Sequence, residues 1–421
     1  MELERYSIGI GDRFGFECTA QLRALQKAIA DGVRIVPVWN KSNREHLIAK
    51  TVPEAARKAA DKAVQTCGWT DSYYIDADHI GTATVDGFLS SHNFFTIDVA
   101  DYIGKAKQNL STDSFHAAIG QYKGSLDIPG MKSPLQVTDA ILGGFARKYL
   151  YAISEAGAVY RHIAGKKGAE SFVVEISMDE AQSPQTPVEL LLILAAIAQE
   201  AIPVQTIAPK FRGAFLKGVD YVGDLEQFTR EFHDDLAVIA FAVNHFNLPR
   251  NLKLSIHTGS DKFSLYPIMH EAIKSMDTGI HLKTAGTTWL EELGGLAASG
   301  GAGLSFAKEI YQTSYERFDE LCSPYLAVIH IEKHQIPSPL KVASWSSDEF
   351  VQALRHDPMC RSYNPNLRQL LHLGFKIAAE TGPRFAELLA ENRDAVEENV
   401  TLNLYDRHIR PLFLGLEPES I

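Results

Sequence analysis

Cysteine is scarce in this chain of 421 residues, which contains only Cys18, Cys67, Cys322 and Cys360. No two of these cysteines form a Cys-x-x-Cys pair, so a zinc site built from thiolates is not expected. Scarce cysteine is typical of proteins kept in a reducing cytoplasm, which is the location we expect here. The stretch MELERYSIGIGD lacks the apolar segment of a signal peptide, so none is predicted.

Long apolar runs and blocks of basic residues are also missing. The longest apolar run, 190–198 (LLLILAAIA), has about half the length of a membrane-spanning helix. The net charge is −11, from 41 Lys and Arg against 52 Asp and Glu, whereas a nucleic-acid-binding domain is usually basic. We therefore expect a small-molecule substrate and neither a membrane nor a nucleic acid as partner. A homo-oligomer stays an open alternative.

Several common catalytic motifs are absent. The sequence contains no His-Glu-x-x-His, no Gly-x-Ser-x-Gly and no Walker A motif, so those metalloprotease, serine hydrolase and P-loop classes are not indicated. The segment 9–15 (GIGDRFG) has a Gly-x-Gly-x-x-x-Gly spacing, not the Gly-x-Gly-x-x-Gly of dinucleotide-binding proteins. A tightly bound NAD is therefore only weakly supported.

Short β-like runs alternate with helical patterns along much of the chain. The helical segments include 53–68, 226–247 and a helix from Pro187 that a Thr186–Glu189 capping box would start. Such alternation predicts parallel strands, and we expect an α/β fold of the (β/α)8 barrel type, with a doubly wound sheet as the alternative. The expected strands are 6–13, 33–41, 72–79, 171–180, 202–210, 251–262, 278–286 and 325–333, with 94–101 as a further candidate of uncertain place.

Two helical regions interrupt or follow this pattern. Residues 99–170 form a long insertion that we expect to be mostly helical, with helices over 105–122 and 138–165. The remainder of the chain from about residue 345 is also largely helical in pattern. We therefore predict a barrel domain over residues 1–345, including the insertion, and a C-terminal helical extension over 346–421 that packs on the barrel.

Many of the expected strands end in ionisable residues. In a (β/α)8 barrel the active site lies at the carboxyl ends of the strands, so these residues are candidates for one common site. Each of them taken singly is more often a surface or capping residue, but their regular placement favours a site. The candidates are Asp12, Arg13, Asn40, Lys41, Asp76, Asp78, His79, Glu175, Asp179, Lys210, His257, Asp261, Lys262, His281 and Lys283.

Three histidines, His79, His257 and His281, each end an apolar strand. Three imidazoles that converge from three strands can bind a divalent cation and leave a coordination position for substrate. Glu175 or Asp78 could complete the set of ligands. The alternative is that each of these histidines is a hydrogen-bonded core residue.

Two carboxylates are candidates for proton transfer. Asp78 precedes His79 at a strand end, where one side chain can bind a metal while the other moves a proton. Glu175 lies within the apolar run VVEIS, where burial would raise its pKa toward the range useful for acid–base catalysis. The alternative for Glu175 is a salt bridge to a lysine of a neighbouring strand.

The stretch 257–267 (HTGSDKFSLYP) is a candidate anion-binding turn. Gly259 permits a tight turn, and backbone amides together with Ser260 and Lys262 would bind a phosphate or a carboxylate. Lys210, Arg212 and Lys283 could add positive charge. An ordinary turn between a strand and a helix is the alternative.

Eight long segments, spread from about residue 6 to residue 415, form a distinctive set: SIGIGDRFG, WNKSNREH, YYIDADHIG, FTIDVADYIG, QTIAPKFRGAFLKGVDYVGD, LSIHTGSDKFSLYP, GIHLKTAGTTWLEE and YNPNLRQLLHLGFKIAAE. Through these segments the chain resembles the tagaturonate epimerase family. More distantly, the Asp78–His79 pair and the His-Thr-Gly-Ser-Asp turn resemble class II, metal-dependent aldolases of the tagatose-bisphosphate type. The aldolases usually have His-Gly where this chain has His-Thr-Gly.

The family resemblance implies an isomerase that interconverts D-tagaturonate and D-fructuronate in hexuronate breakdown. These keto acids differ at a carbon one step beyond the α-position of the ketone, so enolisation cannot invert it. Transient oxidation or retro-aldol cleavage and re-addition remain, and we expect the second. It requires an electrophile, which a divalent cation (Zn, Mn, Ni or Co) would supply, and a base.

The resemblance and the strand-end pattern together give each candidate an expected role. His79, His257 and His281 are the expected metal ligands, with Asp78 and Glu175 as the catalytic carboxylates. The expected substrate-binding residues are Arg13, Lys210, Asp261, Lys262 and Lys283. Among them, Lys262 together with Lys210 or Arg13 would bind the carboxylate of the substrate.

Two other functions stay open. One is an aldolase acting on a ketose phosphate, which would form net cleavage products. The other is a non-catalytic aldolase-like subunit. A neutral ketose such as tagatose or fructose is a further substrate to consider, since only the anion contact would be missing.

Overall fold

Eight parallel strands form a closed barrel in a computed structural model of the chain, which describes residues 1–105, 113–258, 261–284 and 287–418. The strands are hydrogen-bonded in the order β1-β10-β9-β8-β7-β4-β3-β2. The predicted (β/α)8 barrel is therefore confirmed. Its strands are β1 (Tyr6–Gly11), β2 (Val36–Ser42), β3 (Tyr74–Ile80), β4 (Phe94–Asp98), β7 (Val173–Ser177), β8 (Thr206–Ala208), β9 (Lys253–His257) and β10 (Ile280–Lys283).

One predicted strand, 325–333, is wrong. The candidate of uncertain place, 94–101, supplies the eighth strand. Residues 325–333 form no strand, because Tyr325 and Ile329 are buried in the core of the C-terminal helices. Their apolar pattern therefore reflects packing against helices. The eighth strand is instead β4 (Phe94–Asp98), which lies between β3 and β7, and the barrel closes where β1 pairs with β10. The predicted strand 278–286 extends into residues 285 and 286, which lie outside the described residues.

Helices on the outside of the barrel follow most strands. The predicted helix from Pro187 is α6 (Pro187–Gln199), and its Thr186–Glu189 capping box is present. Leu190–Ile197 are all buried, because α6 packs between α5 and α7. The other helices up to β10 are α1 (Cys18–Ala30), α2 (Asn43–Ile48), α3 (Pro53–Cys67), α4 (Asp113–Ile119), α5 (Asp139–Lys167), α7 (Leu225–His245) and α8 (Tyr266–Ser275).

No helix within these described parts of the chain combines the length and the apolar character needed to cross a bilayer.

The expected insertion lies between β4 and β7. It contains the short helix α4, a hairpin of β5 (Gly124–Leu126) and β6 (Leu135–Val137), and the long helix α5. The predicted helix 138–165 corresponds to α5. Of the predicted helix 105–122, the described part contains α4 and a 3-10 turn over Gly120–Tyr122, and residues 106–112 lie outside the described residues.

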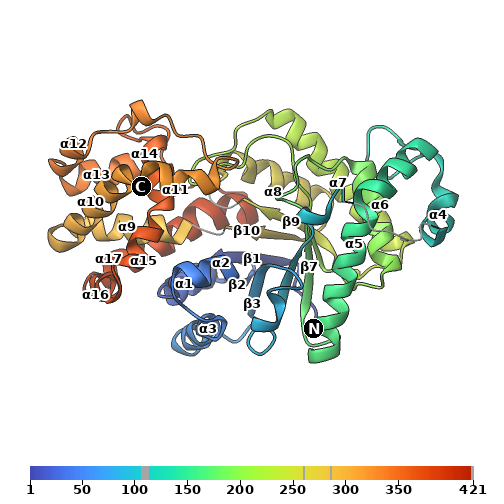
Figure 1. The fold of residues 1–421 in the computed structure, drawn as a ribbon, viewed down its shortest axis with the longest axis horizontal. Helices are drawn as coiled ribbons and strands as arrows, with labels where there is room; N and C mark the ends of the chain where they lie inside the picture. The colour runs from blue at the N-terminus through green and yellow to red at the C-terminus, as the bar shows by residue number, and fades with distance from the viewer. Residues whose placement is uncertain (106–112, 259–260, 285–286, 419–421) are drawn as a thin grey trace.

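The helices after β10 share a second hydrophobic core, which extends from Trp289 to Val400. This core includes residues on both sides of residue 346, and the predicted division of the chain at that residue stays a prediction. Figure 1 shows these helices gathered on one side of the barrel. They are α9 (Thr287–Ala298), α10 (Gly301–Glu316), α11 (Phe318–Cys322), α12 (Pro339–Ala343), α13 (Ser347–Leu354), α14 (Pro365–Leu373), α15 (Phe375–Glu380), α16 (Pro383–Glu391) and α17 (Arg393–Leu402).

The last helical segment, Asn403–Leu414, has π-type hydrogen bonding and returns to the barrel. Its residues Leu404, Ile409 and Leu412 are buried in the barrel's own hydrophobic core. The helical region is therefore attached to the barrel at both of its ends. This attachment places helices such as α14 and α15 beside the carboxyl ends of the strands, where Arg13 donates a hydrogen bond to the carbonyl of His372.

Candidate active site

A buried lysine stands at the centre of a cluster of carboxylates inside the barrel. Lys283, the last residue of β10, has its Nζ 2.8 Å from Oδ1 of Asp78, 2.9 Å from Oδ2 of Asp76 and 2.9 Å from Oε1 of Glu175. Gly9 of β1 makes room for this side chain, because a Cβ there would lie only 2.6 Å from Cγ of Lys283. The three strands β3, β7 and β10 are thus joined electrostatically across the barrel.

The charges in this cluster shift one another's pKa values strongly. Burial alone would lower the pKa of Lys283, but Asp76, Asp78 and Glu175 outweigh it and hold that pKa well above its ordinary value. Burial would likewise raise the pKa of Asp78, but Lys283 brings it down to about 2. Asp76 has its pKa raised to about 6, since burial there exceeds the effect of Lys283.

The expectation that burial would raise the pKa of Glu175 is wrong. Lys283 and His257 outweigh the effect of burial and hold the pKa of Glu175 well below its ordinary range. The alternative of a salt bridge to a lysine is what the structure contains, although this lysine comes from across the barrel. A buried carboxylate with two cationic partners stays ionised, because pairing compensates its loss of hydration.

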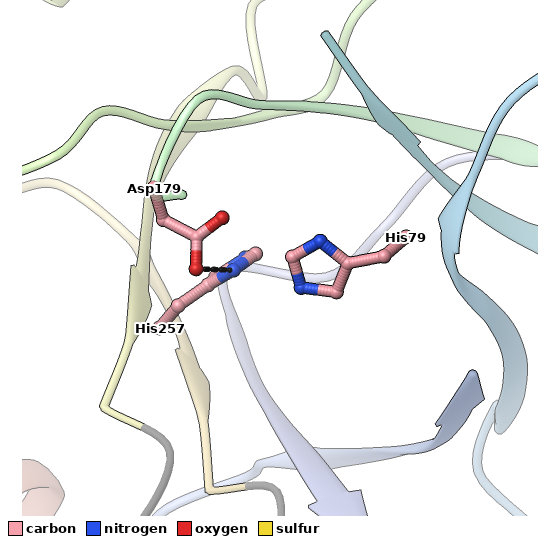
Figure 2. A group of neighbouring side chains, drawn as sticks. All are labelled: His79, Asp179 and His257. Atoms are coloured by element: carbon pink, nitrogen blue, oxygen red, sulfur yellow. Dashed lines mark ion pairs between the residues drawn. The ribbon is translucent and has the colours of Figure 1, made fainter. Parts of the chain in front are cut away.

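Two imidazoles and a carboxylate converge beside this cluster. Single ligand atoms of His79, His257 and Asp179 all lie within 4.8 Å of one another. Nδ1 of His257 is 3.1 Å from Oδ2 of Asp179, and the two imidazole rings lie nearly perpendicular with centroids 5.5 Å apart (Figure 2). His79 ends β3, His257 ends β9, and Asp179 follows β7, so three strand ends contribute.

His79 also belongs to a second group, with Asp98 and Glu180. Its Nδ1 lies 3.1 Å from Oδ2 of Asp98, whose Oδ1 accepts a hydrogen bond of 2.9 Å from the backbone N–H of Ala100. The backbone of His79 has φ +50°, at a register shift between β3 and β4. A non-glycine residue in this conformation is strained, and such residues are concentrated at functional sites.

Carboxylates keep both converging imidazoles protonated. Burial alone would lower the pKa of His79, but Asp78, Asp179 and Asp98 together hold it well above its ordinary value. Burial is similarly outweighed at His257, where Asp179 is the largest opposing influence and the pKa is about 9. A divalent cation binds imidazole in its neutral form, so metal binding would displace these protons.

The donor set fits a divalent cation. Imidazole nitrogens with carboxylate oxygens suit zinc and other first-row divalent ions. Oε2 of Glu175 is buried and has no hydrogen-bond partner among the described residues, so this oxygen retains a free acceptor beside His257. The ligand atoms of His79, His257 and Asp179 can hold such an ion, and Glu175 lies beside them through its contact with His257.

His281 occupies a different place from the other two histidines. It is fully buried in β10, its Nδ1 is 2.8 Å from Oγ of Ser7, and its ring packs against Phe94 with centroids 5.5 Å apart. Burial lowers its pKa to about 3, so the ring is neutral. The convergent group of His79, His257 and Asp179 does not include it. Its predicted role as a metal ligand stays a prediction.

Most of the predicted substrate-binding cations already have partners within the protein. Nζ of Lys262 donates to the carbonyls of Leu216 at 2.9 Å and Val219 at 2.7 Å. Lys210 donates to the carbonyl of Ala181. The anion-binding turn predicted from Gly259 and Ser260 lies outside the described residues.

Arg13 and Asp261 are also engaged. Arg13 lies 3.2 Å from Glu45 and stacks over Phe375 at 4.1 Å. Asp261 is buried and lies 2.5 Å from the guanidinium of Arg368. Asp261 therefore joins the loop after β9 to helix α14, an arrangement that favours a structural contribution.

Sequence reasoning missed Asp98 and Glu180, and it noted Asp179 only as one strand-end residue among many. Asp98 lies within the run 94–101, the strand candidate of uncertain place, and in the structure β4 ends at this residue. The signal for Glu180 was its position next to Asp179. Neither residue stands within a recognisable metal-binding spacing.

The fold and this site define a class of protein. A closed (β/α)8 barrel with imidazoles, carboxylates and a lysine converging at the carboxyl ends of its strands has the architecture of a barrel enzyme. The tagaturonate epimerase family model (UxaE) matches residues 1–410, and the chain belongs to this family. It is accordingly a carbohydrate epimerase, an isomerase.

Individual relatives are similar over nearly the whole chain. A tagaturonate/fructuronate epimerase from Thermotoga maritima is 26% identical, and the match covers 96% of this chain and 80% of that protein. Crystal structures of a fructuronate-tagaturonate epimerase from Cohnella laeviribosi superpose with TM-scores of 0.82 for a glycerol complex and 0.79 for the native form. Both are 23% identical and cover 98% of this chain and 82% of the other, which supports the fold.

Proposed function

We propose that this enzyme interconverts D-tagaturonate and D-fructuronate. The observation that carries the proposal is the group of His79, His257 and Asp179 next to the Lys283 cluster, at the carboxyl ends of the strands of a tagaturonate epimerase family barrel. One end of this site offers donors for a cation, and the other offers ionised carboxylates. A ketone and the hydroxyl of a nearby carbon can be bound by these two parts at once.

We propose that His79, His257 and Asp179 hold a divalent cation such as Zn, Mn, Ni or Co, with Glu175 adjacent. When bound, the cation would polarise the substrate ketone and stabilise the negative charge that develops on its oxygen. This charge must be stabilised in any route that breaks the neighbouring carbon–carbon bond. His257 and Lys283 both contact the carboxylate of Glu175 and would hold it in a fixed position beside the cation.

The inverting carbon lies beyond the position that the ketone acidifies, so deprotonation there gains nothing from the carbonyl. Retro-aldol cleavage avoids this difficulty. The hydroxyl on the inverting carbon loses its proton, and that carbon becomes an aldehyde carbon as its bond to the α-carbon breaks. The electron pair of the broken bond passes to the α-carbon and the ketone oxygen, which leaves the other fragment as an enediolate. The aldehyde then turns over, the bond re-forms on its opposite face, and the proton returns to oxygen.

Asp78 is the base that we propose for this hydroxyl. Lys283 keeps it ionised, which is the state that accepts a proton, and one of its oxygens lies 3.7 Å from Nε2 of His79. Proton acceptance would therefore occur directly beside the proposed cation site. Glu175 is the second catalytic candidate, and it would act through its hydrogen bond to His257.

The test is an NMR assay of metal-loaded protein with D-fructuronate and no added nucleotide. We expect D-tagaturonate to form until equilibrium, without net cleavage products, which also separates this function from a ketose-phosphate aldolase. Substrate deuterated at the inverting carbon should react with only a small isotope effect, because that C–H bond is not broken. A large primary isotope effect would instead support transient oxidation, and full activity after thorough chelation would contradict the proposed cation.

A further inference from the structure

Three cations surround a single aromatic ring beside the mouth of the barrel. Nζ of Lys376 is 4.5 Å from the ring centroid of Tyr325, Nζ of Lys217 is 5.5 Å from it, and the guanidinium carbon of Arg44 is 5.7 Å from it. One ring face attracts a cation, but three like charges around one ring repel one another. We call Arg44, Lys217 and Lys376 the Tyr325 cation cluster.

These cations come from distant parts of the sequence. Arg44 lies on α2 directly after β2, Lys217 lies in the loop after β8, and Lys376 lies on α15. Tyr325 is buried in the core of the C-terminal helices. The cluster therefore forms only where the carboxyl ends of the strands meet the helical region.

The charge of this cluster is not neutralised by direct contacts. Within the described ranges, the side-chain nitrogens of Lys217, Lys376 and Arg44 make no ion pair and no hydrogen bond to the protein. Burial and the nearby charge of Arg13 lower the pKa of Lys217 to about 8, and burial together with Arg44 lowers the pKa of Lys376. Burial and nearby like charges therefore disfavour the protonated form of both lysines, and a bound anion would stabilise that form.

A buried histidine next to the cluster reinforces this conclusion. His372 on α14 is fully buried, and neither of its ring nitrogens has a hydrogen-bond partner among the residues that the structure describes. Its pKa is held well below its ordinary value by burial, then by Arg13 and Lys217. A neutral imidazole among cations can donate one hydrogen bond, as an anion would require.

Glu180 connects the surroundings of the cluster with those of the proposed active site. Glu180 acts electrostatically on Lys217, and a carboxylate oxygen of the same Glu180 lies within 4.8 Å of ligand atoms of His79 and Asp98. A molecule bound between these two places would have one end at the imidazoles and the other at the cations. A six-carbon keto acid with its ketone and carboxylate at opposite ends has this form.

We propose that the Tyr325 cation cluster, with Lys217 as its central member, binds the carboxylate of the sugar-acid substrate. This inference rests on the proposed function for the identity of the anion. The cluster, and not Lys262 or Lys210, is the proposed binding site for the carboxylate, because the ammonium groups of these two lysines already donate to backbone carbonyls.

The position of this anchor suits the proposed reaction. After cleavage, the carboxylate remains on the aldehyde fragment. An anchored carboxylate would retain that fragment while rotation about the bond beside the aldehyde carbon presents its opposite face. Neutral ketoses such as tagatose and fructose would lack the anchor, so the cluster would also determine the preference for an acid.

The first test measures binding without reaction. Metal-loaded protein is titrated calorimetrically at low salt with D-gluconate, a six-carbon sugar acid that lacks the ketone. Removing one charged partner of a carboxylate typically weakens binding by about tenfold to a hundredfold, and we expect this for Lys217→Met. Lys217→Arg should retain most of the affinity. Lys62→Met removes an equally sized charge from the exposed surface of α3 and should have no effect.

The second test separates the substrate carboxylate from a free anion. Lys217→Met should raise the KM for D-fructuronate by about tenfold or more with a smaller change in kcat. If Lys217 governs binding of inorganic phosphate but leaves the KM for D-fructuronate unchanged, the cluster binds a free anion and the proposal is overturned. Gluconate affinity unchanged in folded Lys217→Met would overturn it as well. Absence of epimerisation by the wild type would refute the proposed function, while the gluconate titration would still decide the anion site.

Discussion

The Nε2 atom of His257 lies 2.8 Å from the Oε1 atom of Glu175. This contact joins the imidazole group at the strand ends to the carboxylate cluster around Lys283, which lies deeper in the barrel. The same Oε1 atom is 2.9 Å from Nζ of Lys283. Substitutions in one group will therefore affect the other, and double variants across this contact should deviate from additivity.

Metal content should distinguish two of the histidines. We expect His257→Ala to lose bound metal, because this residue contributes a ligand atom to the convergent group. His281→Ala should retain it, because the His281 ring bonds to Ser7 and stands outside that group. Elemental analysis of both variants after equilibration with the same ion provides the measurement. Equal metal loss in the two variants would restore His281 as a ligand.

Asp98 should position His79 for metal binding. A carboxylate that accepts the second ring N–H of a ligating histidine fixes its tautomer, and loss of such a partner typically weakens metal binding by about 10- to 100-fold. We expect this loss for Asp98→Asn, because Oδ2 of Asp98 lies 3.1 Å from Nδ1 of His79. Competition with a chelator of known affinity measures it. Asp101→Asn, in the following turn, is the matched control and should bind metal as the wild type does.

Asp78 should be needed for turnover more than for metal binding. Removal of a general base typically costs about 10²- to 10⁴-fold in rate, and we expect a kcat reduction in this range for Asp78→Asn. Its metal content should be close to that of the wild type, because Asp78 is not a member of the convergent group. The NMR assay supplies the rate. Near-normal turnover by this variant would exclude Asp78 as the base.

The buried pair of Arg368 and Asp261 should contribute strongly to stability. Both side chains are essentially inaccessible. Arg368→Met would remove the guanidinium from Asp261 and leave this buried carboxylate with the imidazoles of His356 and His408, at a cost of about 3–5 kcal/mol in the free energy of unfolding. The deficit should shrink at acid pH, where Asp261 of the variant can take up a proton. Denaturant unfolding at two pH values measures both effects. Arg384→Met, which breaks a half-exposed pair with Glu309, should cost less than about 1 kcal/mol.

Glu17 should make the protein less stable as the pH rises. Burial, followed by the charge of Asp12, raises its pKa from 4.5 to about 8. The folded state therefore binds more protons than the unfolded state between these values. The stabilisation is fully present below about pH 4.5 and is lost as the pH rises toward 8.

Glu17→Gln removes this titration. We expect the variant to be more stable than the wild type at pH 9 and nearly equal to it at pH 4, as measured by thermal unfolding across the pH range. Glu387→Gln, on an exposed surface of α16, is the control and should leave the pH profile unchanged. A wild-type profile that is flat between pH 5 and 8 would contradict the raised pKa.

The sequence by itself determined the alternation of strands and helices, the capping box of α6 and the placement of ionisable residues at strand ends. These features depend on local periodicity and on the residues next to each element, both of which are read along the chain. They were sufficient to predict a (β/α)8 barrel and to expect His79, His257, Asp78 and Glu175 in one common site.

Only the tertiary structure decided which apolar run closes the barrel and which side chains meet within it. The run 94–98 and the run 325–333 have similar apolar patterns, and burial against a sheet or against helices distinguishes them only after folding. Lys283 reaches Asp78 across 205 residues of sequence, and His79 meets Asp98 through a strained backbone. Arg44 and Lys376 come to the same ring from distant segments. Contacts of this kind depend on the directions in which side chains point across the whole barrel. The local sequence pattern carries no information about these directions.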